Sequence, residues 1–173
     1  MIGLQNNTLN SQRLFYRLID ERDFDDLFII LSEPTVAESA GFKAFTSTDE
    51  FGVFFERFIG ANSAIAILKD NVLIGYIHVN KYDPGLSEFN GKRCAGLGFV
   101  IGKQFQNNGY ATEALITITA YLKKQFDFCF ADHFEDNIAS KRVIEKCGYK
   151  YVDKYTLYFE ELDENITCYS YVY

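Results

Sequence analysis

Residues 106–114 read Gln106-Asn107-Asn108-Gly109-Tyr110-Ala111-Thr112-Glu113-Ala114, and this stretch decides the fold class. The residues before it, 97–101, form an apolar run with the length of a buried strand. The segment after it repeats apolar residues at helical spacing as far as Phe126. The order therefore predicts a strand, a polar turn that contains glycine, and a helix.

The start of this predicted helix is a candidate anion site. The first backbone N–H groups of a helix have no partner inside it, and the helix dipole adds positive potential there, so phosphate is a common occupant. Gly109 allows a ligand to approach the backbone closely, and Ala111 keeps the first turn slim. Two familiar phosphate motifs do not fit, because a Rossmann fingerprint needs three glycines and a P-loop needs Gly-Lys-Ser/Thr.

A second segment, 137–149, reads Asn-Ile-Ala-Ser-Lys-Arg-Val-Ile-Glu-Lys-Cys-Gly-Tyr. Asp136 or Asn137 can cap a short helix here, and Gly148 suits the left-handed position that ends it. An ordinary strand–turn–helix connection explains the first stretch alone, and a short capped helix without a ligand explains the second. Both segments together, in this order, favour a ligand-binding site over two unrelated structural elements.

The two segments resemble two motifs of the GNAT superfamily of N-acetyltransferases, in the subgroup of the ribosomal-protein alanine N-acetyltransferases. The first matches as Gln-x-x-Gly-x-Ala followed by Thr-Glu-Ala-Leu, and the second as Asn-x-x-Ser followed by a helix that ends Glu-Lys-x-Gly-aromatic. The resemblance implies a single α/β (α+β) domain over residues 1–173. It would have a twisted, mixed, mostly antiparallel sheet of about seven strands, about four helices and a cleft where the fourth and fifth strands splay apart.

The resemblance also implies acetyl-CoA (coenzyme A) as cosubstrate. Its pyrophosphate would lie on the 106–112 loop, and its pantetheine arm would bond to the backbone of the fourth strand like an added strand. The residues implied to hold it are Phe99, Val100, Ile101, Gln106, Asn107, Asn108, Gly109, Tyr110, Ala111, Thr112, Asn137 and Ser140. This assignment predicts a single cosubstrate site built from both motifs.

Two side chains are candidates for proton transfer. The resemblance implies that Ser140 lies near the thioester sulfur and protonates the departing thiolate, although a hydroxyl at a helix start can instead bond to backbone. The subgroup places a glutamate base on the fourth strand, and this chain has Gly96 there. His133, at the predicted end of the fifth strand, is the alternative base because histidine side chains in general exchange protons near neutral pH, although such a histidine can also be a surface or core residue. His78 is a weaker candidate.

The favoured function is acetyl transfer to a primary amine, either a protein N-terminal α-amine or a small amine such as a polyamine or an aminoglycoside. The absence of the usual glutamate keeps a catalytically silent acyl-CoA-binding domain as an alternative. A metabolite-binding scaffold without coenzyme A is a third reading. Because an α-amine has a lower pKa than a lysine side chain, the missing base favours acceptors that lose their proton easily.

Composition limits the remaining classes. The chain has 173 residues, 48% of them hydrophobic, which suits one globular domain. The net charge of −7 argues against a nucleic-acid partner and suits a cationic acceptor. Four cysteines, without a Cys-x-x-Cys pair or a histidine cluster, indicate no metal site. No leader pattern and no long apolar run is found, so we expect no membrane association and a cytoplasmic location.

Periodicity and turn residues place the remaining elements. Residues 35–46 and 82–92 are expected to be loops, with Pro34 ending the helix before the first of them. Strands are predicted at 13–19, 63–68, 72–79, 93–101, 128–133, 149–159 and 167–173, and helices at 20–31, 47–59, 110–126 and 137–147.

Overall fold

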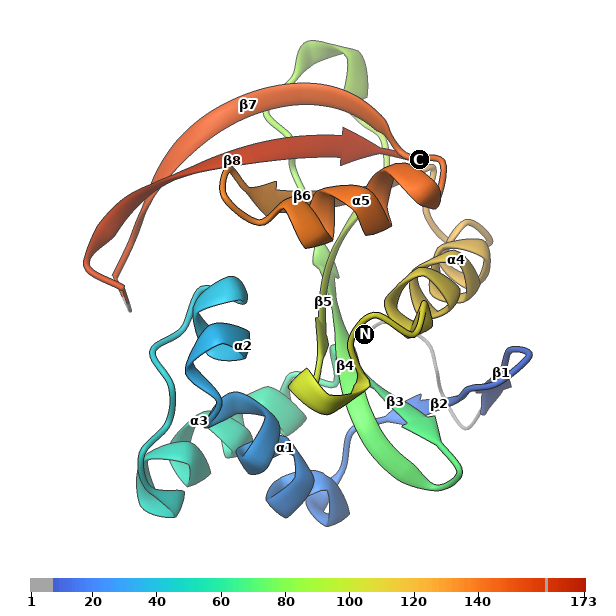
Figure 1. Ribbon diagram of the computed structural model, residues 1–173. Coiled ribbons are helices and arrows are strands. Elements are labelled where there is room, and N and C mark those ends of the chain that lie inside the picture. Colours follow the sequence, from blue (N-terminus) through green and yellow to red (C-terminus); the bar gives the residue numbers. More distant parts are fainter. Residues whose placement is uncertain (1–7, 161) are drawn as a thin grey trace.

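An eight-stranded sheet with the order β1-β2-β3-β4-β5-β6-β8-β7 organises the chain (Figure 1). The computed structural model describes residues 8–160 and 162–173. All neighbouring strands are antiparallel except β5 and β6, which are parallel. The strands are β1 (Leu9–Asn10), β2 (Phe15–Leu18), β3 (Ala64–Lys69), β4 (Val72–Lys81), β5 (Cys94–Ile101), β6 (Phe128–Phe134), β7 (Lys150–Phe159) and β8 (Glu164–Val172).

The helices cover both faces of the sheet. One face packs against α4 (Tyr110–Leu122) and α5 (Ile138–Lys146). The core between this face and the helices includes Leu97, Ile118 and Ala131. The other face packs against α1 (Phe24–Leu31) and α3 (Thr48–Gly60), around Leu27 and Phe51. Figure 1 shows α1 to α3 on one side of β4 and β5 and α4 on the other. The short helix α2 (Pro34–Ser39) and the 3₁₀ turns η1 (Glu21–Asp23), η2 (Ser87–Phe89) and η3 (Lys103–Phe105) complete the fold.

The expected fold class is confirmed, and the structure adds β1 and α2 to the predicted elements. The prediction that 35–46 is entirely a loop is wrong, because Pro34 begins α2 instead of only ending the helix before it. A proline fits the first turn of a helix, where its missing N–H would have no partner. The side chain of Glu33 caps this helix by accepting a hydrogen bond from the Val36 N–H at 2.9 Å. Residues 1–7, expected to be irregular, lie outside the described part of the chain.

The parallel strands β5 and β6 pair over only part of their length. Their register runs from Cys94 opposite Phe128 to Leu97 opposite Ala131. Beyond this point β5 continues to Ile101, and β6 continues to Phe134 paired only with β8. The backbone of residues 98–101 therefore has an edge without a β6 partner, which is the splay that the sequence predicts. Polar backbone groups at such an edge need other partners.

The remaining sequence expectations concern the cysteines, membrane-spanning helices and metal sites. All four cysteines are buried and carry free thiols. Among the described residues, no helix combines the length and the apolar character needed to cross a membrane. In the same part of the chain, no three His, Cys, Asp or Glu side chains gather in a way that could hold a metal ion.

Candidate active site

The loop before α4 has the backbone shape of an anion site. Gly109 is the N-cap residue and has a positive φ of 77°, and no side chain caps this helix end. The first hydrogen bond of the helix runs from the Glu113 N–H to the Gly109 carbonyl, so the N–H groups of Tyr110, Ala111 and Thr112 have no helical acceptor. The Gln106 side chain instead holds the loop on β5, because its amide donates to the Ile101 carbonyl at 3.0 Å.

A contact from the N-terminal segment holds this loop in place, and sequence reasoning missed it. The carboxylate of Glu113, in the first turn of α4, accepts hydrogen bonds from the Ser11 hydroxyl, the Arg13 N–H and the Arg13 Nε, each at 2.7 Å. Arg13 also donates to the Asn108 carbonyl at 3.1 Å and lies 4.7 Å from the centre of the Tyr110 ring. Although burial raises the pKa of Glu113, the hydrogen bonds from Ser11 and Arg13 leave it below its ordinary value. The carboxylate therefore stays ionised and keeps this contact at neutral pH.

A cavity of about 490 Å³ opens in front of this loop. It is lined by every residue that the sequence implied for the cosubstrate except Asn108. The side chain of Asn108 donates to the Phe105 and Gln106 carbonyls and so shapes the turn. The cavity is also lined by Lys103, Arg142 and Lys146, which the sequence did not single out, and by no carboxylate.

The charge of this cavity suits a phosphorylated ligand. Three cationic side chains and a helix N-terminus gather in a chain whose net charge is −7. A local positive field of this kind attracts a polyanion although the whole molecule repels it. The unpaired edge of β5 adjoins the same cavity through Phe99, Val100 and Ile101. A nucleotide with an extended amide-bearing arm fits both features.

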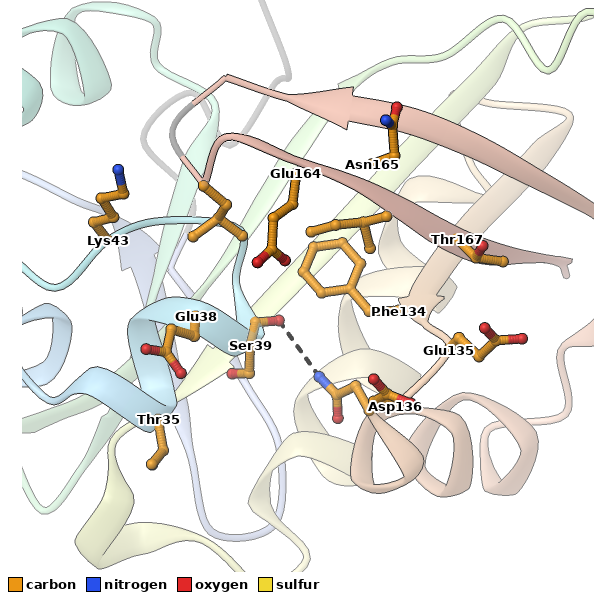
Figure 2. A pocket seen from close by; sticks show the side chains of 13 residues that line it. Thr35, Glu38, Ser39, Lys43, Phe134, Glu135, Asp136, Glu164, Asn165 and Thr167 are labelled. Atoms are coloured by element: carbon orange, nitrogen blue, oxygen red, sulfur yellow. Dashed lines mark hydrogen bonds between the residues drawn. The ribbon is translucent and has the colours of Figure 1, made fainter.

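The second motif forms the opposite wall. Asn137, and not Asp136, caps α5, since its side-chain oxygen accepts a hydrogen bond from the Ser140 N–H at 3.0 Å. Its amide nitrogen donates to the Ser39 carbonyl at 3.4 Å, which links α5 to α2 (Figure 2). Ser140 lines the cavity, and its hydroxyl makes no hydrogen bond within the described chain. The hydroxyl is therefore available to a ligand.

The two histidines have different surroundings. His133 is 5% exposed and lines neither cavity described here. Its ring stacks on Tyr169 at 5.3 Å between centres, its Nδ1 donates to the Phe134 carbonyl at 2.8 Å, and its buried Nε2 has no partner in the described chain. His78 stands opposite Gly98 in the β4–β5 register, beside the splay. Burial lowers the pKa of His78, so its ring is neutral at pH 7.

Position 96 is closed by neighbouring side chains. A Cβ atom built on Gly96 would lie 2.7 Å from Asn80 Oδ1 and 3.2 Å from Tyr82 Cδ2. At Gly98, on the same face, a Cβ atom would meet nothing within 4 Å. The space for a glutamate at position 96 is thus filled by Asn80 and Tyr82, and the next position on the same face, Gly98, is open.

A second cavity, of about 800 Å³, lies between α2, the end of β6 and the start of β8. It shares Thr35, Ser39 and Asn137 with the first cavity, so the two adjoin. Figure 2 shows the carboxylate of Glu164 pointing from β8 toward Ser39. Among the described residues, the charged side chains of its wall are Glu38, Glu135, Asp136, Glu164 and Lys43, an excess of three negative charges.

Comparison with known proteins assigns the family. Residues 13–150 match the model of the acetyltransferase (GNAT) domain. The chain belongs to the GNAT family of acetyltransferases. It is therefore an acetyl-CoA-dependent acyltransferase, with acetyl-CoA as its cosubstrate.

Individual GNAT proteins resemble the chain in sequence or in fold. The chain is 27% identical over 145 residues to the uncharacterized N-acetyltransferase YnaD of Bacillus subtilis (strain 168), covering 81% of each. A GNAT-family acetyltransferase structure from Bacillus anthracis has a TM-score of 0.81 at 22% identity, over 96% of this chain and 98% of that one.

Two further structures of the same fold carry coenzyme A. RimL, a ribosomal L7/L12 α-N-protein acetyltransferase, has a TM-score of 0.72 at 17% identity, over 95% of this chain and 97% of that one. The spermidine N-acetyltransferase of Vibrio cholerae, in complex with coenzyme A and spermine, has a TM-score of 0.75 at 15% identity, over 94% of this chain and 96% of that one.

Proposed function

We propose that this GNAT acetyltransferase transfers the acetyl group of acetyl-CoA to the α-amine of a protein N-terminus, which enters through the 800 Å³ cavity. The observation that carries this proposal is the adjacency of the two cavities at Thr35, Ser39 and Asn137. An acceptor in one cavity and a thioester in the other would meet there. The ribosomal-protein subgroup that the two sequence motifs resemble, and the fold shared with RimL, favour an N-terminal α-amine.

The residues of the first cavity would have separate roles toward acetyl-CoA. The free N–H groups of Tyr110, Ala111 and Thr112 would bind the pyrophosphate, and Lys103, Arg142 and Lys146 would balance phosphate charge. The backbone of residues 99–101 would bond to the amides of the pantetheine arm. Ser140 would donate a proton to the departing thiolate, since its hydroxyl lines the cavity without another partner.

A small polyamine is the second candidate acceptor, favoured by the charge of the acceptor cavity. Glu135 is paired with Lys154 at 3.1 Å, but Glu38, Asp136 and Glu164 have no ion-pair partner in the described chain. Three unpaired carboxylates around one cavity suit a ligand with several ammonium groups. An α-amine followed by basic residues would use the same charges.

A panel of acceptors tests the proposed function. Peptides with free α-amines, with and without a basic residue at the second position, are compared with spermidine and an N-acetylated, lysine-containing peptide, and thiol release from acetyl-CoA is measured. We expect the highest kcat/KM for a peptide α-amine. A higher kcat/KM for spermidine than for every peptide would identify a small polyamine as the acceptor. No turnover on any amine would contradict the proposed function.

Replacing Glu164 with glutamine is expected to lower kcat/KM about two- to fivefold for acceptors with two or more positive charges, and to leave a singly charged acceptor unchanged. One exposed charge pair contributes up to about 1 kcal/mol in water, and less at higher salt. Steady-state kinetics at two ionic strengths measures the effect. The matched control is Glu56→Gln, because Glu56 is exposed on α3 and lines neither cavity. Equal effects of both variants would contradict the role of Glu164.

Replacing Arg13 with methionine is expected to weaken acetyl-CoA binding about three- to tenfold, which is about 1 kcal/mol. The substitution removes the hydrogen bonds from the Arg13 side chain to Glu113 and Asn108, so the loop that presents Gly109 loses its fixed position. Titration calorimetry gives the affinity. Arg93→Met is the control, because Arg93 forms a comparable exposed ion pair with Asp127 and lines neither cavity. An affinity that falls equally in both variants would show a general charge effect instead.

A further inference from the structure

Asp132 occupies the point where the sheet opens. It is the first residue of β6 beyond the last pair with β5, which joins Leu97 to Ala131. Paired residues of neighbouring strands share a face, and alternate residues of a strand do too. Because Gly96 pairs with Phe130, Asp132 is on the face of Gly96 and Gly98, opposite the face that packs on α4.

This face connects Asp132 with the acceptor cavity. Phe134, two residues further along β6 and therefore on the same face, lines that cavity. On the β5 side, Gly98 is exposed and a Cβ atom there would meet nothing within 4 Å. Asp132 itself lines neither cavity. It lies between Phe134, on the wall of the acceptor cavity, and the bare part of β5, next to the unpaired backbone.

The carboxylate of Asp132 is held by one oxygen only. Its Oδ2 accepts hydrogen bonds from the hydroxyls of Tyr155 at 2.7 Å and Tyr82 at 3.5 Å. Its Oδ1 is buried and has no hydrogen-bond partner in the described chain. Ser170, opposite Asp132 on β8 and 3% exposed, lies close enough to lower the pKa of Asp132, but its hydroxyl makes no hydrogen bond of standard geometry in the described chain. A desolvated carboxylate oxygen without a donor is costly unless a ligand supplies one.

We propose that Asp132 takes the proton from the acceptor ammonium, in the role that a carboxylate at position 96 would have. This inference rests on the proposed acetyl transfer to an amine. The acceptor R–NH₃⁺ gives one proton to the carboxylate of Asp132 and becomes R–NH₂. Its nitrogen forms a bond to the thioester carbonyl carbon, and the carbon–sulfur bond then breaks. The thiolate receives a proton from Ser140, whose oxygen is reprotonated by the second proton of the nitrogen, and Asp132 returns its proton to water.

The surroundings of Asp132 favour a proton acceptor. Burial raises the pKa of Asp132, while Ser170, Tyr155, Tyr82 and His133 partly oppose this increase. A raised pKa makes a carboxylate a stronger base once it is ionised. The titratable groups nearby are the Tyr82 and Tyr155 hydroxyls, the Cys168 thiol on β8 and the His133 ring, which belongs to the opposite face.

The test is the pH dependence of kcat/KM for Asp132→Asn in the full chain, with a peptide α-amine as acceptor. In the wild-type protein the rate should rise with pH through one ionisation that the acceptor does not explain. In Asp132→Asn we expect kcat/KM to fall about 100-fold at pH 7, this ionisation to disappear, and the rate to follow the free-amine fraction. Acetyl-CoA affinity should change less than about threefold, which separates this effect from loss of the cosubstrate site.

Two further variants keep the inference falsifiable if Asp132→Asn folds poorly. Tyr155→Phe removes a donor to the ionised carboxylate, so the ionisation should move to higher pH, which a purely structural residue would not cause. His133→Gln examines the rival base. The inference is overturned if Asp132→Asn keeps the ionisation, if Tyr155→Phe leaves it in place, or if His133→Gln removes it. A wild-type protein that binds acetyl-CoA but acetylates no amine would instead overturn the proposed function, and this inference with it.

Discussion

Replacing Ser140 with alanine is expected to lower the turnover number about 100-fold, while the affinity for acetyl-CoA changes less than about threefold. Ser140 lines the cavity that we propose for acetyl-CoA, and its hydroxyl has no hydrogen-bond partner in the described chain, so it can donate to a sulfur that carries developing negative charge. The helix start should survive the change, because the bond to Asn137 comes from the Ser140 backbone N–H. Steady-state kinetics and calorimetric titration with acetyl-CoA measure the two effects.

A conservative variant separates chemistry from packing. Ser140→Thr keeps the hydroxyl and adds a methyl group, so it should retain far more activity than Ser140→Ala. Single-turnover measurement is required, because a step after the chemistry can limit kcat and hide the loss. If Ser140→Ala equals the wild type in a single turnover, the hydroxyl does not protonate the thiolate.

Replacing Gly109 with valine is expected to weaken acetyl-CoA binding at least tenfold, which is about 1.4 kcal/mol. The φ of 77° at this position is rare for a β-branched residue and costs about 1–3 kcal/mol in strain. The loop must shift to relieve this strain, and the free N–H groups of the first helical turn then lose their common direction. Simple crowding is not the cause within the free protein, because a Cβ atom here would meet only Arg13 Nη2, at 3.6 Å.

Gly91→Val is the matched control for this variant. Gly91 has nearly the same φ, 72°, a Cβ atom there would meet nothing within 4 Å, and the residue lines neither cavity. Both variants should lose similar thermal stability, and only Gly109→Val should lose affinity. A folded Gly109→Val protein with wild-type affinity would remove the loop from the cosubstrate site.

The parts of the fold that could be predicted depend on local sequence. The turn before α4 and the cap of α5 follow from residues within one helical turn of each other, such as Asn137 and Ser140. The contact between Arg13 and Glu113 joins residues 100 positions apart, and no local sequence pattern predicts it. The role of Pro34 could not be predicted, because a proline can end one helix or begin the next. The cap by Glu33 decides between these two roles.

The candidate base could not be chosen from the sequence because neighbouring residues of a strand point to opposite faces. His133 and Asp132 are adjacent in the chain, and only the β5–β6 register shows which of them faces the splay. A glutamate introduced at position 96 would also not restore a base without a rearrangement. The Asn80 side chain occupies that space, so the larger residue requires Asn80 to move.

The short pairing of β5 and β6 has a consequence for stability if acetyl-CoA binds beside it. Among the described residues, only four residue pairs join the strands β1–β5 to the strands β6–β8 within the sheet. A bound pantetheine arm would bridge the two groups of strands. A ligand at 100 times its dissociation constant adds about 2.7 kcal/mol to the free energy of unfolding. Selection for acetyl-CoA affinity would then also select for resistance to unfolding, because the same backbone edge supplies both.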